Sequence, residues 1–166
     1  MLQVGSQVMY GIHGVCNVIG TEMRTIDRKS VEYLILEPND QPGACFYVPA
    51  HNPVALSKLH PLIAKEEMEM LLESVEGNQA NWITSENLRK QKYKELINNV
   101  DRAEIIGMIR LLHDHKAAQL AAGRKFHLCD ENFLRDARKL LASECVVVLG
   151  LSRNEVTDYL NIKLMK

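Results

Sequence analysis

The sequence lacks the features that mark membrane-spanning and secreted proteins. No apolar run approaches the roughly 20 residues that span a bilayer. The first residues, Met1 to Gly5, show no basic stretch leading into an apolar one. The four cysteines are widely and irregularly spaced, at Cys16, Cys45, Cys129 and Cys145. We therefore expect a cytoplasmic protein with reduced thiols and no membrane contact.

Motifs of common catalytic and metal sites are also missing. The chain has no Gly-rich phosphate loop, no His-Glu-x-x-His pair and no nucleophile elbow. His113 and His115 are two residues apart, so on a helix they would point to different sides and could not chelate one metal together. His13 and Cys16 lack the further ligands that zinc requires. We predict a protein without enzymatic activity, metal or cofactor.

The charge of the chain is nearly balanced overall but unevenly distributed. With 166 residues, 46% of them hydrophobic, the chain is long enough for one sizeable core or two small ones. The formal net charge is −1, yet residues 82–139 carry an excess of basic side chains, with a cluster at Arg89-Lys90-Gln91-Lys92-Tyr93-Lys94. Basicity of this size suits contact with a short piece of DNA backbone and is too weak to drive tight binding alone.

The first sixty residues have the pattern of short strands. Apolar residues alternate with polar or small ones near the N-terminus, and later runs are rich in β-branched side chains. Strands are expected within residues 4–10, 15–26, 31–36 and 44–48. Residues 38–43 combine two prolines with Asn, Asp and Gly, which predicts a turn. So few short strands cannot form a sandwich, so we predict a small closed barrel.

After Pro61 the apolar residues recur at helical spacing. A first helix is expected to end at Gly77-Asn78, and a second to begin after a cap at Thr84 or Ser85. A third helix is expected to begin after a cap at Asp101, and a fourth to begin at Asp130. The last helix is expected to begin with a capping box formed by Ser152 and Glu155. The fold class is therefore α+β, with a small β-barrel over residues 1–60 followed by an all-α helical bundle over residues 61–166.

Several stretches resemble one known family. The opening reads Val4-Gly5-Ser6-Gln7-Val8-Met9-Tyr10-Gly11-Ile12-His13-Gly14-Val15, which is similar to the "VGDxVVYPxHGVG" start of the CarD family of bacterial transcription regulators. The same module occurs in the transcription-repair coupling factor, within a long helicase chain. The likeness continues at Arg24-Thr25-Ile26, residues 32–36, Val48-Pro49, Asn81-Trp82 and residues 130–134, so it covers almost the whole chain.

This resemblance implies a fold and a function. It implies a Tudor-like (SH3-like) barrel that adds an edge strand to the β subunit of RNA polymerase. It also implies that the helical domain reaches the upstream edge of the transcription bubble, where a tryptophan enters the minor groove and stabilises the open promoter complex. The expected partners are thus the polymerase β subunit and promoter DNA, bound weakly and without sequence specificity. The protein is expected to act as a monomer.

The resemblance also assigns polymerase-binding residues on the barrel. They are Met23, Arg24, Thr25, Ile26 and Tyr47. An exposed strand edge is a template for pairing with another chain, which gives this assignment a physical basis. Tyr47 stands where some members carry a basic residue, so its part as an electrostatic contact is open, although tyrosine is a good interface residue. On composition alone, a solvated arginine on an ordinary barrel strand is the favoured interpretation of Arg24, and the resemblance reverses that preference.

The DNA-binding residues implied by the resemblance are Trp82, Arg89, Lys90 and Lys92. Trp82 is the only tryptophan and lies among polar residues at a helix start. It is either a wedge between unstacked bases or a packing lid between two helices. The three cations would neutralise phosphates beside it, or form a solvated helix face. A protein–protein adaptor with a peptide-binding barrel and no DNA contact is the alternative function.

Overall fold

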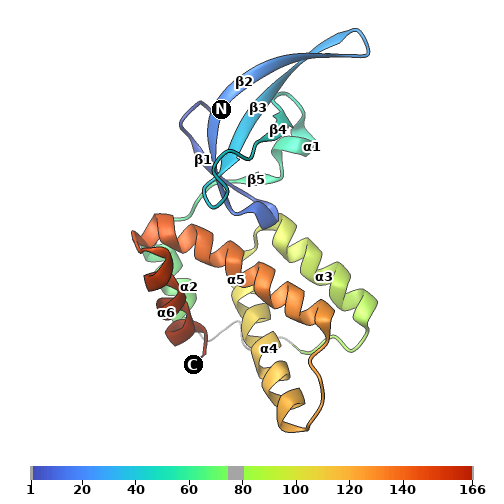
Figure 1. Cartoon of the computed structure of the whole chain (residues 1–166), viewed down its shortest axis with the longest axis vertical. Coiled ribbons are helices and arrows are strands. Elements are labelled where there is room, and N and C mark those ends of the chain that lie inside the picture. The colour runs from blue at the N-terminus through green and yellow to red at the C-terminus, as the bar shows by residue number, and fades with distance from the viewer. Residues whose placement is uncertain (1, 75–80, 166) are drawn as a thin grey trace.

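The chain folds into an antiparallel sheet at one end and a group of helices at the other (Figure 1). This structure is a computed structural model that describes residues 2–74 and 81–165. The predicted α+β class, with strands first and helices after them, is confirmed. None of the described helices combines the length and the apolar character needed to cross a bilayer.

Five strands form the sheet, in the order β4-β3-β2-β1-β5. Their bounds are β1 Gln7–Tyr10, β2 Val15–Ile26, β3 Lys29–Pro38, β4 Phe46–Pro49 and β5 Leu59–His60. Strands β2 and β3 form one long hairpin whose two turn residues, Asp27 and Arg28, both have positive φ, at 48° and 64°. Two positive φ values in a two-residue loop match the right-handed twist of the flanking strands.

A short helix joins the two end strands of the sheet. Strands β4 and β5 lie at the two ends of the ladder, and no pair between them occurs in the described part of the chain. The short helix α1 (Pro53–Leu56) connects them instead. Its residues Ala55 and Leu56 pack against the sheet core, which consists of Val8, Cys16, Val18, Leu34, Leu36 and Val48.

The helices begin largely where local capping signals predict. Their bounds are α2 Lys65–Glu73, α3 Glu86–Asn99, α4 Arg102–Ala121, α5 Leu128–Leu149 and α6 Arg153–Leu164. The caps at Ser85, Asp101 and Ser152 are confirmed, and Ser152 forms the full capping box with Glu155. Helix α5 begins at Leu128, before the predicted start at Asp130. The predicted helix end at Gly77-Asn78 lies outside the described residues.

Two residues of the sheet belong to the hydrophobic core that the helices form. Met9 and Val15 come from the sheet, yet both are fully buried in the cluster that the helices build. Between them, the 3₁₀ turn η1 (Gly11–His13) packs against α3 and α5. The backbone N–H of Val15 donates to Ser143 Oγ of α5 at 2.9 Å. The junction is therefore built into the fold and is more than a flexible hinge.

A buried ion pair fixes the segment that leads from the sheet to the helices. Glu144 of α5 is fully buried, and its carboxylate accepts hydrogen bonds from Arg102 Nε and Nη2, each at 2.8 Å. The same carboxylate accepts from the Ile63 N–H at 3.0 Å, and Arg102 also donates to the Pro61 carbonyl at 2.8 Å. These bonds satisfy the buried charge and tie residues 61–63 to α4 and α5.

Replacing Gly14 with alanine is expected to destabilise the protein by about 1–3 kcal/mol more than replacing Gly43. Both glycines have positive φ, at 69° and 88°, which side chains rarely adopt, so both substitutions carry backbone strain. A Cβ on Gly14 would lie 2.5 Å from Ser143 Oγ and 2.8 Å from Ser143 Cβ, whereas a Cβ on Gly43 would meet nothing within 4 Å. Urea unfolding of the two variants measures the difference; equal midpoints would contradict the close approach of η1 to α5.

Candidate functional site

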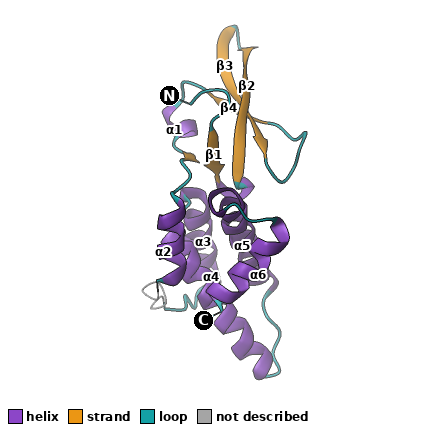
Figure 2. Ribbon diagram, turned by 90° about the vertical axis from the view of Figure 1, so that its left-hand side faces the viewer, coloured by secondary structure: helices purple, strands orange, loops and turns teal. Residues whose placement is uncertain are grey.

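The outer edge of β2 is open along the projecting part of the hairpin. Strand β2 pairs with β3 through to Ile26, but with β1 only from Val15 to Asn17. Figure 2 shows β2 and β3 extending past the other strands. The predicted segment Met23–Ile26 lies on this projection, and its side chains are exposed. Backbone groups on such an edge are available to pair with a strand of another chain.

Arg24 of β2 and Tyr47 of β4 meet on one face of the sheet. The Arg24 guanidinium carbon lies 3.9 Å from the centroid of the Tyr47 ring and 5.9 Å from that of Tyr33. Arg24 Nη2 also donates to Glu22 Oε2 at 3.2 Å, and this hydrogen bond raises the pKa of Arg24. The structure thus brings together two of the predicted residues. Arg24 is exposed, permanently charged and held in one orientation by an aromatic ring.

Trp82 is half-buried, so its ring is neither as exposed as a free wedge nor as enclosed as a packing lid between two helices. Its ring stacks on His115 of α4, with centroids 3.6 Å apart and planes 10° from parallel. The Arg89 guanidinium carbon lies 4.6 Å from the indole centroid. The ring packs beside the helical core but is not enclosed by it. Trp82 is therefore a partly accessible apolar ring held in place by two named neighbours.

Arg89 does not lie on the exposed helix face that the sequence predicts, and this position requires a correction. Its residue is only 6% exposed, and its Nε and Nη2 donate to Asp130 Oδ1 and Oδ2 at 2.7 and 3.0 Å. Its Nη1 donates to the Ile83 carbonyl at 2.9 Å. The physical reason is helical spacing: Arg89 shares the inward stripe of α3 with Tyr93 and Leu96. A guanidinium bound in this way faces Asp130 and Trp82, and not a phosphate.

The two predicted lysines do reach the surface of α3. Lys92 is exposed, and it takes part in no ion pair among the described residues. Lys90 Nζ lies 2.6 Å from Glu86 Oε1, and hydrogen bonding to that carboxylate raises the pKa of Lys90. Lys92 therefore offers a full positive charge to a partner, whereas the charge of Lys90 is partly neutralised.

Sequence reasoning missed His115 and Asp130 as supports of Trp82. His115 lies 33 positions after Trp82, and Asp130 lies 41 positions after Arg89. In the sequence, Asp130 marks a predicted helix start and belongs to the family-like stretch 130–134, and neither feature indicates a contact with Arg89. No local signal could have identified either role, because each depends on how α3, α4 and α5 pack together.

The described residues contain no group of three or more His, Cys, Asp or Glu side chains that could hold a metal ion. Two of the cysteines are unsuited to nucleophilic chemistry. Burial raises the pKa of both Cys16 and Cys145 to about 12. A thiol with so high a pKa is protonated at neutral pH and unreactive.

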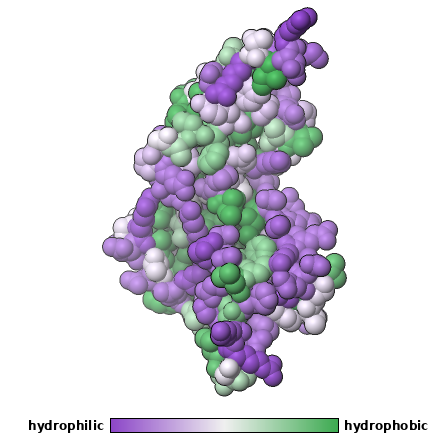
Figure 3. Space-filling model, turned by 45° about the vertical axis from the view of Figure 1, so that its right-hand side comes forward, coloured by the Kyte–Doolittle hydropathy of each residue, from purple (hydrophilic) through white to green (hydrophobic). Residues whose placement is uncertain are grey.

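Most of the surface shown in Figure 3 is hydrophilic over the helical part, with apolar residues emerging in small separate groups.

The comparison with known proteins concerns the sheet. Residues 2–60 match the family model described as CarD-like/TRCF RID domain. Domains of this family have a Tudor-like fold and interact with RNA polymerase through its β subunit. No curated protein matches the chain. The matched residues include the open edge of β2 together with Arg24 and Tyr47.

Proposed function

We propose that this CarD-like protein, whose residues 2–60 form a CarD-like/TRCF RID domain, is a non-enzymatic cytoplasmic regulator that stabilises the open promoter complex. The domain at residues 1–60 binds the β subunit of RNA polymerase, and the helical domain at residues 61–166 contacts the upstream edge of the promoter bubble. The observation that carries the proposal is the open edge of β2 beside the Arg24–Tyr47 pair, within the matched domain.

The polymerase contact rests on main-chain pairing supplemented by one oriented charge. The segment Met23–Ile26 offers unpaired backbone groups to a strand of the β subunit, which gives affinity with little dependence on sequence. Arg24 supplies selectivity, because a guanidinium stacked on Tyr47 keeps N–H donors for a carboxylate of the partner. The adjacent tyrosine adds apolar contact area.

The DNA contact rests on Trp82 with Lys90 and Lys92. Proteins that hold a distorted duplex insert apolar side chains at unstacked base steps, and a half-buried indole is suited to this role. His115 and Arg89 position the ring before DNA arrives, so less conformational entropy is lost on binding. Lys92, and Lys90 after release from Glu86, neutralise neighbouring phosphates without reading bases. Arg89 acts here as a positioning residue and makes no phosphate contact.

Replacing Trp82 with alanine is expected to shorten the open-complex lifetime by at least about tenfold, since one unstacked step is worth a few kcal/mol. Thermal stability is expected to fall only modestly, by about 1–2 kcal/mol, because the ring is half-buried and loses mainly its stacking on His115. Lifetimes are measured on one promoter at fixed salt, with polymerase, with and without the variant. Trp82→Phe is the matched control, which keeps an apolar ring and should retain part of the effect.

Two outcomes would count against the DNA role. An unaltered lifetime with a large fall in melting temperature would make Trp82 a packing residue. An unaltered lifetime with normal stability and normal retention of polymerase would favour the adaptor that does not touch DNA.

A further inference from the structure

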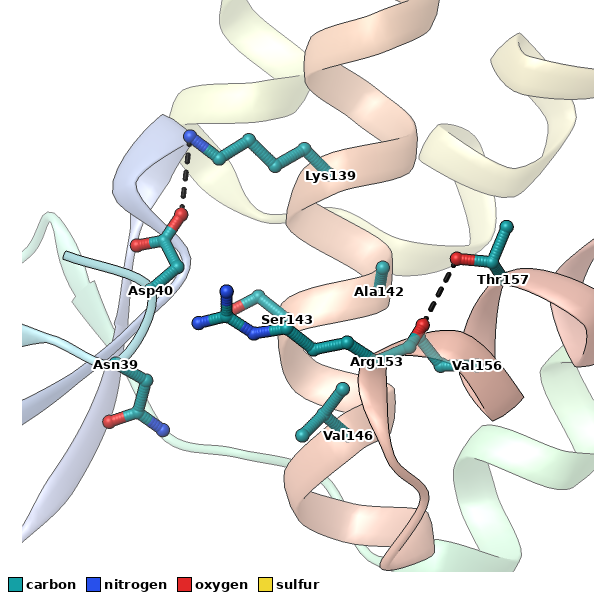
Figure 4. Close-up of a pocket in the computed structure, with 9 residues that line it drawn as sticks. All are labelled: Asn39, Asp40, Lys139, Ala142, Ser143, Val146, Arg153, Val156 and Thr157. Carbon is teal, nitrogen blue, oxygen red and sulfur yellow. Dashed lines mark hydrogen bonds and ion pairs between the residues drawn. The ribbon is translucent and has the colours of Figure 1, made fainter.

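A hollow of about 520 Å³ lies where the sheet meets the helices, away from both surfaces proposed above. Its walls come from the loop after β3, from α5 and from the first turn of α6 (Figure 4). The volume falls in the range of about 300–1,000 Å³ typical of small-molecule sites. The floor is apolar and consists of Ala142, Val146 and Val156, so an occupant would bury a hydrocarbon or ring portion there.

The charges around the hollow do not cancel. Lys139 Nζ pairs with Asp40 Oδ2 at 3.2 Å across the mouth. Arg153 is exposed, and its guanidinium meets no acceptor among the residues described here. Figure 4 shows the Arg153 side chain extending from α6 across the hollow toward Ser143 and the loop after β3. One unpaired positive charge therefore faces the space.

The polar groups at the rim are mainly donors. Ser143 Oγ accepts from the Val15 N–H, which leaves its own O–H free to donate. Asn39 Oδ1 accepts from Asn17 Nδ2 at 2.6 Å, which leaves the Asn39 NH₂ group free. The only carboxylate in the lining, that of Asp40, is already paired with Lys139. A surplus of donors with one free guanidinium selects for an anion.

We propose that this hollow binds a small organic anion, a carboxylate or a phosphate monoester attached to an apolar body. The anionic group would lie against Arg153, Ser143 and Asn39, and the apolar body against Val146 and Val156. Because these residues belong to both the sheet and the helices, an occupied site would stiffen the junction between them. The proposal goes beyond the polymerase and DNA contacts and does not depend on either.

The test uses the full chain with hexanoate and hexyl phosphate as probes and 1-hexanol as the uncharged comparison. Methyl resonances of Val146 and Val156 are followed by NMR during titration. Both anions are expected to shift these methyls saturably and to bind about tenfold more tightly than hexanol, since charge-assisted hydrogen bonds are worth about 1.4 kcal/mol or more. Whichever anion binds more tightly identifies the source as a carboxylate or a phosphate ester.

Variants separate this site from adventitious binding. Arg153→Gln is expected to weaken both anions about tenfold and to leave hexanol unchanged. Arg135→Gln removes an arginine from an exposed part of α5 outside the hollow and should change nothing. Ala142→Leu fills the hollow and should abolish binding of all three probes. Hexanol binding as tightly as hexanoate, anion binding unaffected by Arg153→Gln, or the absence of any methyl shift would overturn the proposal.

Discussion

Replacing Arg24 with glutamate is expected to abolish retention of the polymerase β subunit, with a loss of about 2–5 kcal/mol in binding free energy. The substitution removes the cation stacked on Tyr47 and places a second carboxylate beside Glu22, at the open edge of β2. The fold should be unaffected, because exposed substitutions of this kind change stability by no more than about 0.5 kcal/mol. Dissociation constants for the purified β subunit and a thermal melt measure the two quantities.

The matched control for this prediction is Lys58→Glu. It makes the same change in net charge, also within residues 2–60, at an exposed position between α1 and β5. It should bind the β subunit as the unaltered protein does. Equal affinity of the Arg24 variant and the control would remove Arg24 from the polymerase contact and leave main-chain pairing alone.

Replacing Asp130 with asparagine is expected to destabilise the protein by about 3–5 kcal/mol, because it leaves the buried Arg89 without its counter-charge. For a chain of this length such a loss lowers the melting temperature by about 10 °C. Since Arg89 also lies over the indole, the emission of the single tryptophan, Trp82, should change in the folded variant. Thermal unfolding followed by fluorescence records both effects.

Asp136→Asn provides the control on the same helix. Asp136 pairs with Arg135, whose side chain is 67% exposed, and surface pairs of this kind contribute only about 0–1 kcal/mol. A similar loss of stability in the two variants would contradict the larger stabilisation expected from the buried Arg89–Asp130 pair. Unchanged Trp82 emission in Asp130→Asn would show that the Arg89–Asp130 ion pair does not position the indole ring.

The parts of the fold that were predictable depend on neighbours in sequence. Ser85, Asp101 and Ser152 cap helices because a side-chain oxygen accepts a hydrogen bond from the backbone N–H three residues further on. The strands of the sheet follow from alternation along short runs. The start of α5 was misplaced for a related reason: a cap at His127 without a side-chain hydrogen bond leaves no local mark.

The candidate site was predictable in part. Arg24 and Lys92 were correctly expected at the surface, because each lies outside the apolar pattern of its own strand or helix. The stacking of Arg24 on Tyr47 joins β2 to β4 across β3, and the pairing of Arg89 with Asp130 joins α3 to α5. Such contacts depend on tertiary packing. A basic residue within a basic cluster gives no indication that its guanidinium is turned inward.

The placement of Met9 and Val15 in the helical core has a consequence for how the protein unfolds. Opening the sheet would expose apolar surface that the helices also depend on, so the two parts should form one cooperative unit. The backbone amide protons of both parts near the junction would then exchange with solvent only when the whole protein unfolds. A force that a bound macromolecule exerts on the hairpin would therefore be transmitted to the helices through the packed residues Met9 and Val15.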